Sequence, residues 1–394
     1  MKKSKIGLII GTLPARYRGI AAGGIATHID GLISALNKEK IQTFICYHKP
    51  FGIKHPDVIN SLKIGWIKAV LKGFLMLFFV KGYTIRRYSF KTNVLIAYYY
   101  ATLSVFLKKH TPDFIHIHSL YNPAAIALKW LKYSKSIIIT DHGFWLDGNY
   151  PEDKKLTILL RDNYAVASNV IYISVVALIQ HQKAKLGDLT KLVKISNPTF
   201  FDNYPYKSCS KSADNKKVII FNGYKESLTT KGLSFLLEAL DNNDYFNTRV
   251  RLLIICNDEA QKYIQDHTWN FEYKVFGRTK FEDILKMYTQ SDLLVVPSKF
   301  ESFGLVYTEA LAVGIPVIGY YAMINEFRQT LNMYIGAPID ITRERPSDLA
   351  QRIIECLETS FDPKGVREAL MKHYDWGNLI DRFLVLYYGT CDNK

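Results

Sequence analysis

One segment, residues 297–318, constrains the fold of this chain more than any other. It reads PSKFESFGLVYTEALAVGIPVI and follows a short apolar run over residues 292–297. Gly314 and Pro316 end a helix, and a second apolar run begins directly behind them. The pattern predicts a strand, a loop, a short helix and another strand, which is the repeating unit of an open parallel α/β sheet.

The loop of this segment has the properties of a ligand site. Ligands of open parallel sheets bind outside the carboxyl ends of the strands, and residues 298–304 lie at such an end. Gly304 allows a ligand to approach the backbone, and the N–H groups behind it form a helix N-terminus suited to an anion. Glu301 precedes this helix and Glu309 lies within it. The carboxylates accept hydrogen bonds from hydroxyls, so the segment predicts a ligand with both hydroxyl and phosphate groups.

The spacing of the two glutamates carries a family resemblance. Glu301 and Glu309 have seven residues between them within PSxxESFGLxxxEALAxGxPVI. This pattern resembles the signature of the retaining GT-B glycosyltransferases of family 4. The resemblance implies an α/β fold with two Rossmann-like domains that face each other across a cleft. It implies an acceptor domain over residues 1–199, onto which a C-terminal helix at 376–390 returns, and a nucleotide-sugar domain over 216–375. The alternative is an ordinary connection whose glutamates face water.

The resemblance assigns roles in the C-terminal half. Glu309 is expected to hold the ribose hydroxyls, and Glu301 to contact the transferred sugar and act in catalysis. Lys231, in a Lys-Gly pair before a predicted helix, is expected to neutralise the diphosphate and to act in catalysis. Tyr224 stands where the family has arginine, which makes Lys225 a candidate for the missing charge. Together with the backbone near Arg278, which is expected to meet the nucleobase, the expected donor-binding residues are Gly23, Gly24, Lys225, Lys231, Arg278, Ser302, Phe303, Gly304, Leu305 and Glu309.

Histidines mark the corresponding region of the N-terminal half. His118 ends a predicted buried strand, and His142 follows another, so both are expected at the carboxyl ends of strands. His118 matches the family histidine that contacts the donor sugar, and it is expected to act in catalysis. His28 follows Gly23-Gly24 in a loop similar to the family GGxxxH loop, and His28 and His142 are expected on the acceptor side. His116 is expected on the other face of its strand, with a structural role.

The distribution of charge points to an anionic partner. Residues 1–110 hold 18 lysines and arginines against three acidic residues, so the entire net charge of +15 lies there. Residues 61–109 combine nine of these basic residues with Trp66, Phe74, Phe78, Phe79 and the Tyr98–Tyr100 run. Such a mixture predicts docking on an anionic membrane surface. The alternative is a buried helix pair whose lysines face water.

The remaining features concern compartment and metal. Five cysteines without a CxxC pair favour a reducing compartment and argue against a disulfide framework or a zinc site. The N-terminal apolar run is short and is interpreted as a strand, with export as the alternative. We therefore expect a cytoplasmic protein, peripheral on the inner face of the cell membrane. No DxD triplet occurs, which argues against a metal-bridged diphosphate, and no cofactor is expected.

These observations predict a metal-independent retaining glycosyltransferase, of the hexosyltransferase class. The expected donor is a nucleoside-diphosphate sugar, and the expected acceptor is a saccharide, lipid-linked, in polysaccharide or glycoconjugate synthesis. Two alternatives remain open. One is a GT-B nucleotide-sugar 2-epimerase, which needs no acceptor. The other is a non-catalytic protein that binds sugar or nucleic acid, although no aromatic-basic RNA motif is present and a nucleic-acid partner is not expected.

Overall fold

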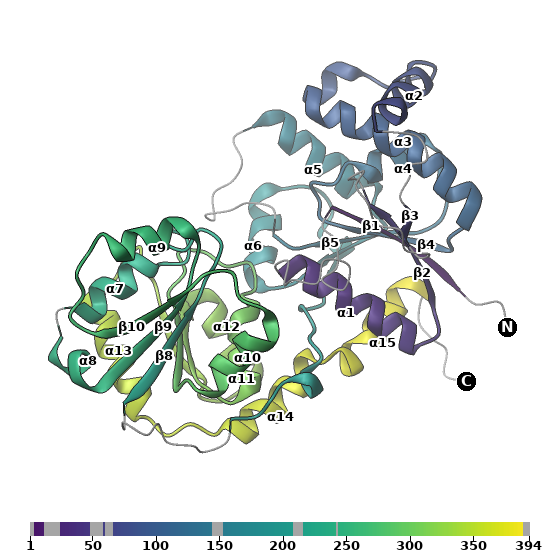
Figure 1. Cartoon of the computed structure of the whole chain (residues 1–394). Helices are drawn as coiled ribbons and strands as arrows, with labels where there is room; N and C mark the ends of the chain where they lie inside the picture. The colour runs from purple at the N-terminus through teal and green to yellow at the C-terminus, as the bar shows by residue number, and fades with distance from the viewer. Residues whose placement is uncertain are drawn as a thin grey trace. The chain divides into compact units, whose positions relative to one another are not determined.

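The chain divides into two compact units (Figure 1). Unit 1 comprises Met1–Pro198 with Leu379–Lys394, and unit 2 comprises Thr199–Asn378. The computed structural model describes residues 4–11, 24–47, 58–59, 66–143, 153–207, 216–241 and 243–388. Each unit is built around one parallel sheet with helices packed on it, as the alternation of apolar runs and amphipathic segments predicts.

Unit 1 contains a seven-stranded sheet in the order β3-β2-β1-β4-β5-β6-β7. Every adjacent pair of strands is parallel. Runs of branched aliphatic residues form these strands because both faces of a parallel sheet are covered. The strands are β1 (Lys5–Ile10), β2 (Gln42–Tyr47), β3 (Val58–Ile59), β4 (Phe114–His118), β5 (Ile137–Asp141), β6 (Asn169–Tyr172) and β7 (Leu192–Lys194).

The two faces of this sheet have different neighbours. Ile115 and Ile117 of β4 belong to an apolar core that also contains buried residues of α3, α4 and α5. His116 and His118 alternate to the other face, where His116 meets Tyr387 of α15 and His118 meets His28 of α1. The helices of this unit are α1 (Gly24–Lys38), α2 (Trp66–Phe78), α3 (Phe90–His110), α4 (Ala124–Trp130), α5 (Lys154–Val166) and α6 (Val175–Ala184), and α15 (Trp376–Tyr388) returns to it.

Unit 2 contains a six-stranded parallel sheet in the order β10-β9-β8-β11-β12-β13. Its strands are β8 (Lys217–Asn222), β9 (Val250–Ile255), β10 (Glu272–Phe276), β11 (Leu293–Val296), β12 (Val317–Tyr320) and β13 (Gly336–Ile339). Its helices are α7 (Leu233–Asp241), α8 (Asp244–Arg249), α9 (Asp258–Gln265), α10 (Phe281–Thr289), α11 (Leu305–Val313), α12 (Tyr321–Leu331), α13 (Pro346–Glu358) and α14 (Pro363–Tyr374).

The segment that follows unit 1 differs from its predicted form. The sequence predicts a polar linker over residues 200–215, but the described part, which ends at Lys207, packs onto unit 2. Phe201 and Tyr204 are buried, and Arg367 Nη2 donates to their carbonyl oxygens at 2.9 and 3.0 Å. The prediction of a linker was therefore wrong for this part. The prediction rested on the polar composition of the segment and did not take into account that two of its aromatic residues, Phe201 and Tyr204, are buried.

In both sheets the strand order reverses beside the first strand of the unit. The reversal lies between β1 and β4 in unit 1, and between β8 and β11 in unit 2. Ligands of open α/β sheets bind at such a point, outside the carboxyl ends of the strands. In unit 2 the loops that leave β8 and β11 carry Lys231 and Glu301, so the topology brings the predicted donor residues to this point.

Candidate active site

The loop between β11 and α11 forms one side of the site in unit 2. Gly304 adopts the left-handed conformation, with φ of 76°, and α11 begins directly after it. Among the described residues no side chain caps this helix N-terminus, so its first N–H groups are available to an anion. The side chain of Phe303 packs on Phe327 and Tyr374 in the core. Phe303 can therefore present only its backbone to a ligand.

Glu301 is the centre of a small polar network. Its Oε1 accepts hydrogen bonds from Lys231 Nζ at 2.5 Å and from Ser298 Oγ at 2.9 Å. Both Glu301 and Ser298 are buried, and Lys231 is half-buried. The structure thus brings together two predicted site residues from adjacent strand ends, and it adds Ser298, which the sequence analysis did not single out although it lies within the motif.

The two loops that carry this network touch through their backbones. The N–H of Lys299 donates to the carbonyl of Thr230 at 2.9 Å. Gly232 has a φ of +75°, and a Cβ atom at this position would lie 2.2 Å from the carbonyl oxygen of Pro297. Glycine is required here by both conformation and space. The position of Lys231 beside Glu301 therefore depends on the residue that follows it.

Glu309 occupies a different environment on α11. Its side chain is buried, and burial raises the pKa of its carboxyl to about 7. Burial, and after it the charge of Glu309, raises the pKa values of Tyr204 and Tyr288. Both tyrosines thus remain protonated beside Glu309, and Tyr288 also accepts a hydrogen bond from Asn222 at 2.7 Å. Near neutral pH Glu309 can exist in either protonation state.

The other predicted donor residues of unit 2 lie apart from this network. Lys225 and Tyr224 are exposed in the loop after β8. Arg278 is exposed after β10, which is the edge strand of the sheet. Their roles toward phosphate and nucleobase stay predictions. Leu305 and Ser302 are half-buried around Gly304.

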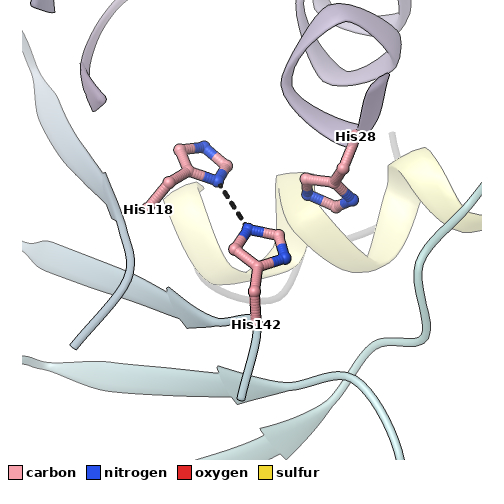
Figure 2. Close-up of side chains that lie close together, drawn as sticks. All are labelled: His28, His118 and His142. Carbon is pink, nitrogen blue, oxygen red and sulfur yellow. Dashed lines mark hydrogen bonds between the residues drawn. The ribbon is translucent and has the colours of Figure 1, made fainter. Parts of the chain in front are cut away.

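Three histidines form a second cluster, in unit 1. Figure 2 shows His118 and His142, from the ends of β4 and β5, next to His28 of α1. His118 Nδ1 and His142 Nε2 are 3.2 Å apart and share a hydrogen bond. The ring centroid of His28 lies 4.9 Å from that of His142 and 5.5 Å from that of His118. Of the residues predicted nearby, Gly24 begins α1, while Gly23 lies outside the described residues.

Burial makes these histidines neutral. All three are buried. Burial, together with neighbouring imidazoles, lowers the pKa values of His28 and His118 well below the usual range, and burial lowers that of His142 to about 4. Within the described part of the chain, His118 Nε2 and His142 Nδ1 have no hydrogen-bond partner. These neutral nitrogens can donate to or accept from the hydroxyls of a ligand.

The same cluster has a donor set that fits a metal ion. One nitrogen from each of the three histidines lies within 4.8 Å of the others, and no second such group occurs in the described residues. Neutral imidazoles are ligands for zinc and other transition metals. The cysteines contribute nothing here, since the described ones, Cys46, Cys256 and Cys356, are free and buried elsewhere.

His116 departs from its predicted orientation. Residues two apart in a strand share a face, so the expectation that His116 points away from His118 was wrong. Their rings stack at a centroid distance of 4.4 Å. His116 Nδ1 pairs with the Tyr387 hydroxyl and Nε2 with Thr140 Oγ1, both at 2.7 Å. Both ring nitrogens of His116 are paired with protein groups, so His116 contributes to the cluster through its stacking contact with His118.

Two protein-family models match consecutive parts of the chain. The model described as Glycosyltransferase Family 4 matches residues 22–177, and the model described as Glycosyl transferases group 1 matches residues 206–370. The first match includes the three histidines and the second includes the Lys231–Glu301 network. The chain belongs to the family 4, group 1 glycosyltransferases. The resemblance carried by residues 297–318 is thereby confirmed.

Two relatives of this family 4 glycosyltransferase come from Methanocaldococcus jannaschii. The uncharacterized glycosyltransferase MJ1607 is 31% identical over 110 residues, which are 27% of this chain and 27% of the relative. The uncharacterized glycosyltransferase MJ1178 is 25% identical over 168 residues, which are 36% of this chain and 44% of the relative. The matched stretches thus span less than half the length of both relatives.

Solved structures share the fold over almost the entire chain. Sucrose-phosphate synthase from Thermosynechococcus elongatus superposes with a TM-score of 0.73 at 17% identity, covering 98% of both chains. Anabaena Alr3699/HepE in complex with UDP-glucose gives a TM-score of 0.67 at 16% identity, covering 96% of this chain and 98% of that one. The fold of this family 4 glycosyltransferase is therefore α/β of the GT-B type, as predicted.

A buried pair of ionisable residues lies near the histidines. Asp141, at the end of β5, pairs with His181 of α6 at 2.9 Å, and both side chains are buried. The two residues are distant in sequence and belong to no motif. A side-chain pair of this kind appears only when the strand and the helix are placed together. It lies at the end of β5, directly before His142.

Proposed function

We propose that this protein transfers a hexose from a nucleoside-diphosphate sugar to a saccharide acceptor, with retention of anomeric configuration and without a metal ion. The observation that carries the proposal is the network of Lys231, Ser298 and Glu301 at the reversal point of the unit 2 sheet. The buried Glu309 lies on the helix that begins there. This set of groups complements a ligand that carries hydroxyls and phosphates. The complex of HepE with UDP-glucose supports the same donor class.

Each part of the nucleotide-sugar substrate has a complementary group in the protein. Glu309 accepts hydrogen bonds from the ribose hydroxyls, and the N-terminus of α11 receives a phosphate. Lys231 Nζ pairs with Glu301 Oε1 in this structure. An ammonium group has three N–H donors, so Lys231 can keep its bond to Glu301 and add one to the diphosphate. Glu301 then accepts from hydroxyls of the transferred sugar.

The proposed reaction needs no carboxylate nucleophile. The acceptor hydroxyl attacks the anomeric carbon from the face that the diphosphate leaves. The bond from the anomeric carbon to the acceptor oxygen forms as the bond to the phosphate oxygen breaks, and the acceptor proton passes to that phosphate oxygen. Lys231 and the N-terminus of α11 stabilise the negative charge that develops on the leaving group.

Unit 1 supplies the acceptor side in this proposal. His118 contacts the donor sugar, and His28 and His142 border the acceptor, with neutral nitrogens suited to hydroxyls. The excess of basic residues in 1–110 favours an anionic acceptor, such as a saccharide linked to a lipid through phosphate. The corresponding pathway is the synthesis of a polysaccharide or glycoconjugate, at the cytoplasmic face of the cell membrane.

The test is incubation of the purified protein with labelled UDP-, GDP- and ADP-sugars and a lipid extract. Transfer yields a labelled lipid-linked saccharide, and NMR of the product reports whether the anomeric configuration is retained. Lys231→Ala is expected to lower the rate of product formation at least about tenfold. Epimerised donor without acceptor product would identify an epimerase instead, and binding without turnover would identify a binding protein. A product with inverted configuration would refute the retaining mechanism.

A further inference from the structure

One face of the helix α2 packs closely against α3. Ala69, Val70 and Leu77 on this face are buried. Gly73 lies so close to α3 that a Cβ atom there would be 1.8 Å from the carbonyl oxygen of Ala97. Figure 1 shows α2 lying over α3 at the edge of the unit. The opposite face of α2 therefore points away from α3.

That outward face is apolar. Ile67, Leu71, Leu75 and Phe78 follow one another at intervals of four, four and three residues and expose between 64% and 85% of their surface. This spacing aligns them in one stripe along the helix. Phe79 follows at 77% exposed, with its ring 5.5 Å from that of Phe78. A surface helix normally turns polar residues outward, and a large exposed apolar patch marks an interaction site.

Positive charges flank the stripe. Lys68 and Lys72 are exposed beside it on α2, and no acidic residue occurs between Asp57 and Asp113. The chain beyond α2 adds further exposed basic residues, together with the exposed Ile85 and Phe90. These basic residues are Lys81, Arg86 and Lys91. The name α2 surface is used below for the outward face of α2 together with Phe79, which directly follows the helix. On α2 itself this surface comprises Ile67, Lys68, Leu71, Lys72, Leu75 and Phe78.

We propose that the α2 surface docks the protein on an anionic lipid bilayer. Its lysines would meet the phosphate groups of the lipids, and its leucines and phenylalanines would enter the boundary between headgroups and acyl chains. A second copy of this chain is a poor occupant, because a symmetric contact would oppose lysine to lysine. α2 has 13 residues, fewer than the roughly 20 needed to span a bilayer. Among the described residues, no helix is long and apolar enough to cross a membrane.

The structure narrows which residues of the 61–109 region take part. Arg87 donates twice to Asp162 at 2.6 Å, so it is committed to a pair within the protein. Phe74 packs against the core of unit 1, and the Tyr98–Tyr100 run is buried in it. The prediction that these aromatic residues contribute to docking was therefore wrong. The Trp66 side chain lies outside the described part.

The proposal is tested by sedimenting the full-length protein with vesicles. The vesicles are made of phosphatidylcholine alone or of phosphatidylcholine mixed with phosphatidylglycerol. Each lysine near an anionic surface changes partitioning roughly fivefold. Lys68→Gln with Lys72→Gln is therefore expected to weaken binding to the anionic vesicles by about 25-fold at low salt. Lys38→Gln with Lys40→Gln, two exposed lysines at the far end of α1, is the matched control and is expected to change little.

A second pair of variants probes the apolar stripe. Phe78→Ser with Phe79→Ser is expected to remove the binding that persists in high salt, where the charge contribution is screened. Ile179→Ser with Leu189→Ser, at exposed apolar positions elsewhere in unit 1, is the control. All these side chains are exposed, so unchanged thermal unfolding is expected and verifies folding.

Several outcomes would overturn the proposal. These are equal binding to both kinds of vesicle, absence of binding to anionic vesicles, and an equal loss in variants and controls. A dimer in light scattering that disappears with Phe78→Ser and Phe79→Ser would assign the surface to a second copy. The assay contains no donor or acceptor, so its result is independent of the transferase assay.

Discussion

Donor binding is expected to depend on pH through Glu309. Burial raises the pKa of this carboxyl to about 7. The proposed ribose contact requires a carboxylate, because a protonated carboxyl offers fewer acceptor positions to two hydroxyls. Protons and donor therefore compete for the same side chain. Affinity should rise with pH as Glu309 ionises.

The size of the effect follows from the pKa. A carboxyl with a pKa of 7 is about one-tenth ionised at pH 6 and about nine-tenths ionised at pH 8. If only the ionised form binds the donor, the Kd falls about tenfold between these two pH values. At pH 7 the complex should release about half a proton for each donor bound.

Isothermal titration calorimetry measures both quantities. A panel of UDP-glucose, GDP-mannose and ADP-glucose first identifies a nucleotide sugar that binds, and the titration is repeated in buffers of different ionisation enthalpy. Glu309→Gln is expected to bind more weakly than the parent at pH 8 and to lose the pH slope. Glu326→Gln, which alters another buried carboxyl on α12, is the control and should keep the slope. A parent affinity that is constant from pH 6 to 8, or the same slope in Glu309→Gln, would refute the reasoning.

Three further predictions concern charge, metal and backbone. Lys231→Ala and Glu301→Ala should each lower kcat/KM at least about tenfold, since a charged hydrogen bond contributes about 1.5–3 kcal/mol. In steady-state assays the double variant should lower kcat/KM by less than the product of the two single-variant factors, because the two side chains are in contact. Excess EDTA should leave the rate of sugar transfer unchanged. If transfer instead required a metal ion, and if the protein lost that ion when the three clustered histidines were replaced, the metal-independent scheme would be contradicted. Gly232→Ala should lower the free energy of unfolding in urea by about 1–3 kcal/mol, because its φ is +75° and its Cβ would meet backbone. Gly277→Ala, whose Cβ would meet only the side-chain tip of Gln261 at 3.2 Å, should cost less, and equal costs would disprove the steric argument.

Much of the fold followed from local pattern, and the exceptions have physical reasons. The strands at Lys5–Ile10 and Phe114–His118 lie where an N-terminal strand and a strand ending at His118 were predicted, because continuous apolar runs are characteristic of parallel strands. Strand β13, Gly336–Ile339, was missed because it contains glycine and proline. A proline is tolerated there because β13 is an edge strand. Edge position is a property of the assembled sheet, which no local pattern contains.

The site was predictable where a motif was continuous. Glu301 and Glu309 belong to one motif, and both lie in the β11–α11 segment where the pattern placed them. The bond between Lys231 and Glu301 could not be predicted from spacing, because it depends on the adjacency of β8 and β11 in the sheet. The exposed stripe of α2 and the buried face of α3 cannot be distinguished from the sequence, since both helices combine apolar and basic residues. Only packing decides which of them reaches solvent.

The ionisable groups of the two candidate sites fall into two kinds, and this division supports the pH argument. Burial shifts Glu309 and the three clustered histidines toward their neutral forms. The neutral imidazoles suit the uncharged hydroxyls of a sugar, because they exchange hydrogen bonds without a large cost of desolvation, whereas Glu309 must ionise to hold the ribose. Lys231 and Glu301 form an ion pair in unit 2, and the proposal assigns the diphosphate to this lysine. The pKa of His142 lies at about 4, and those of His28 and His118 are held well below the usual range by burial and by neighbouring imidazoles, so those rings stay neutral throughout pH 6 to 8. A pH slope of donor affinity in that range therefore reports on Glu309, and Glu309→Gln should abolish it whether or not the histidines touch the donor.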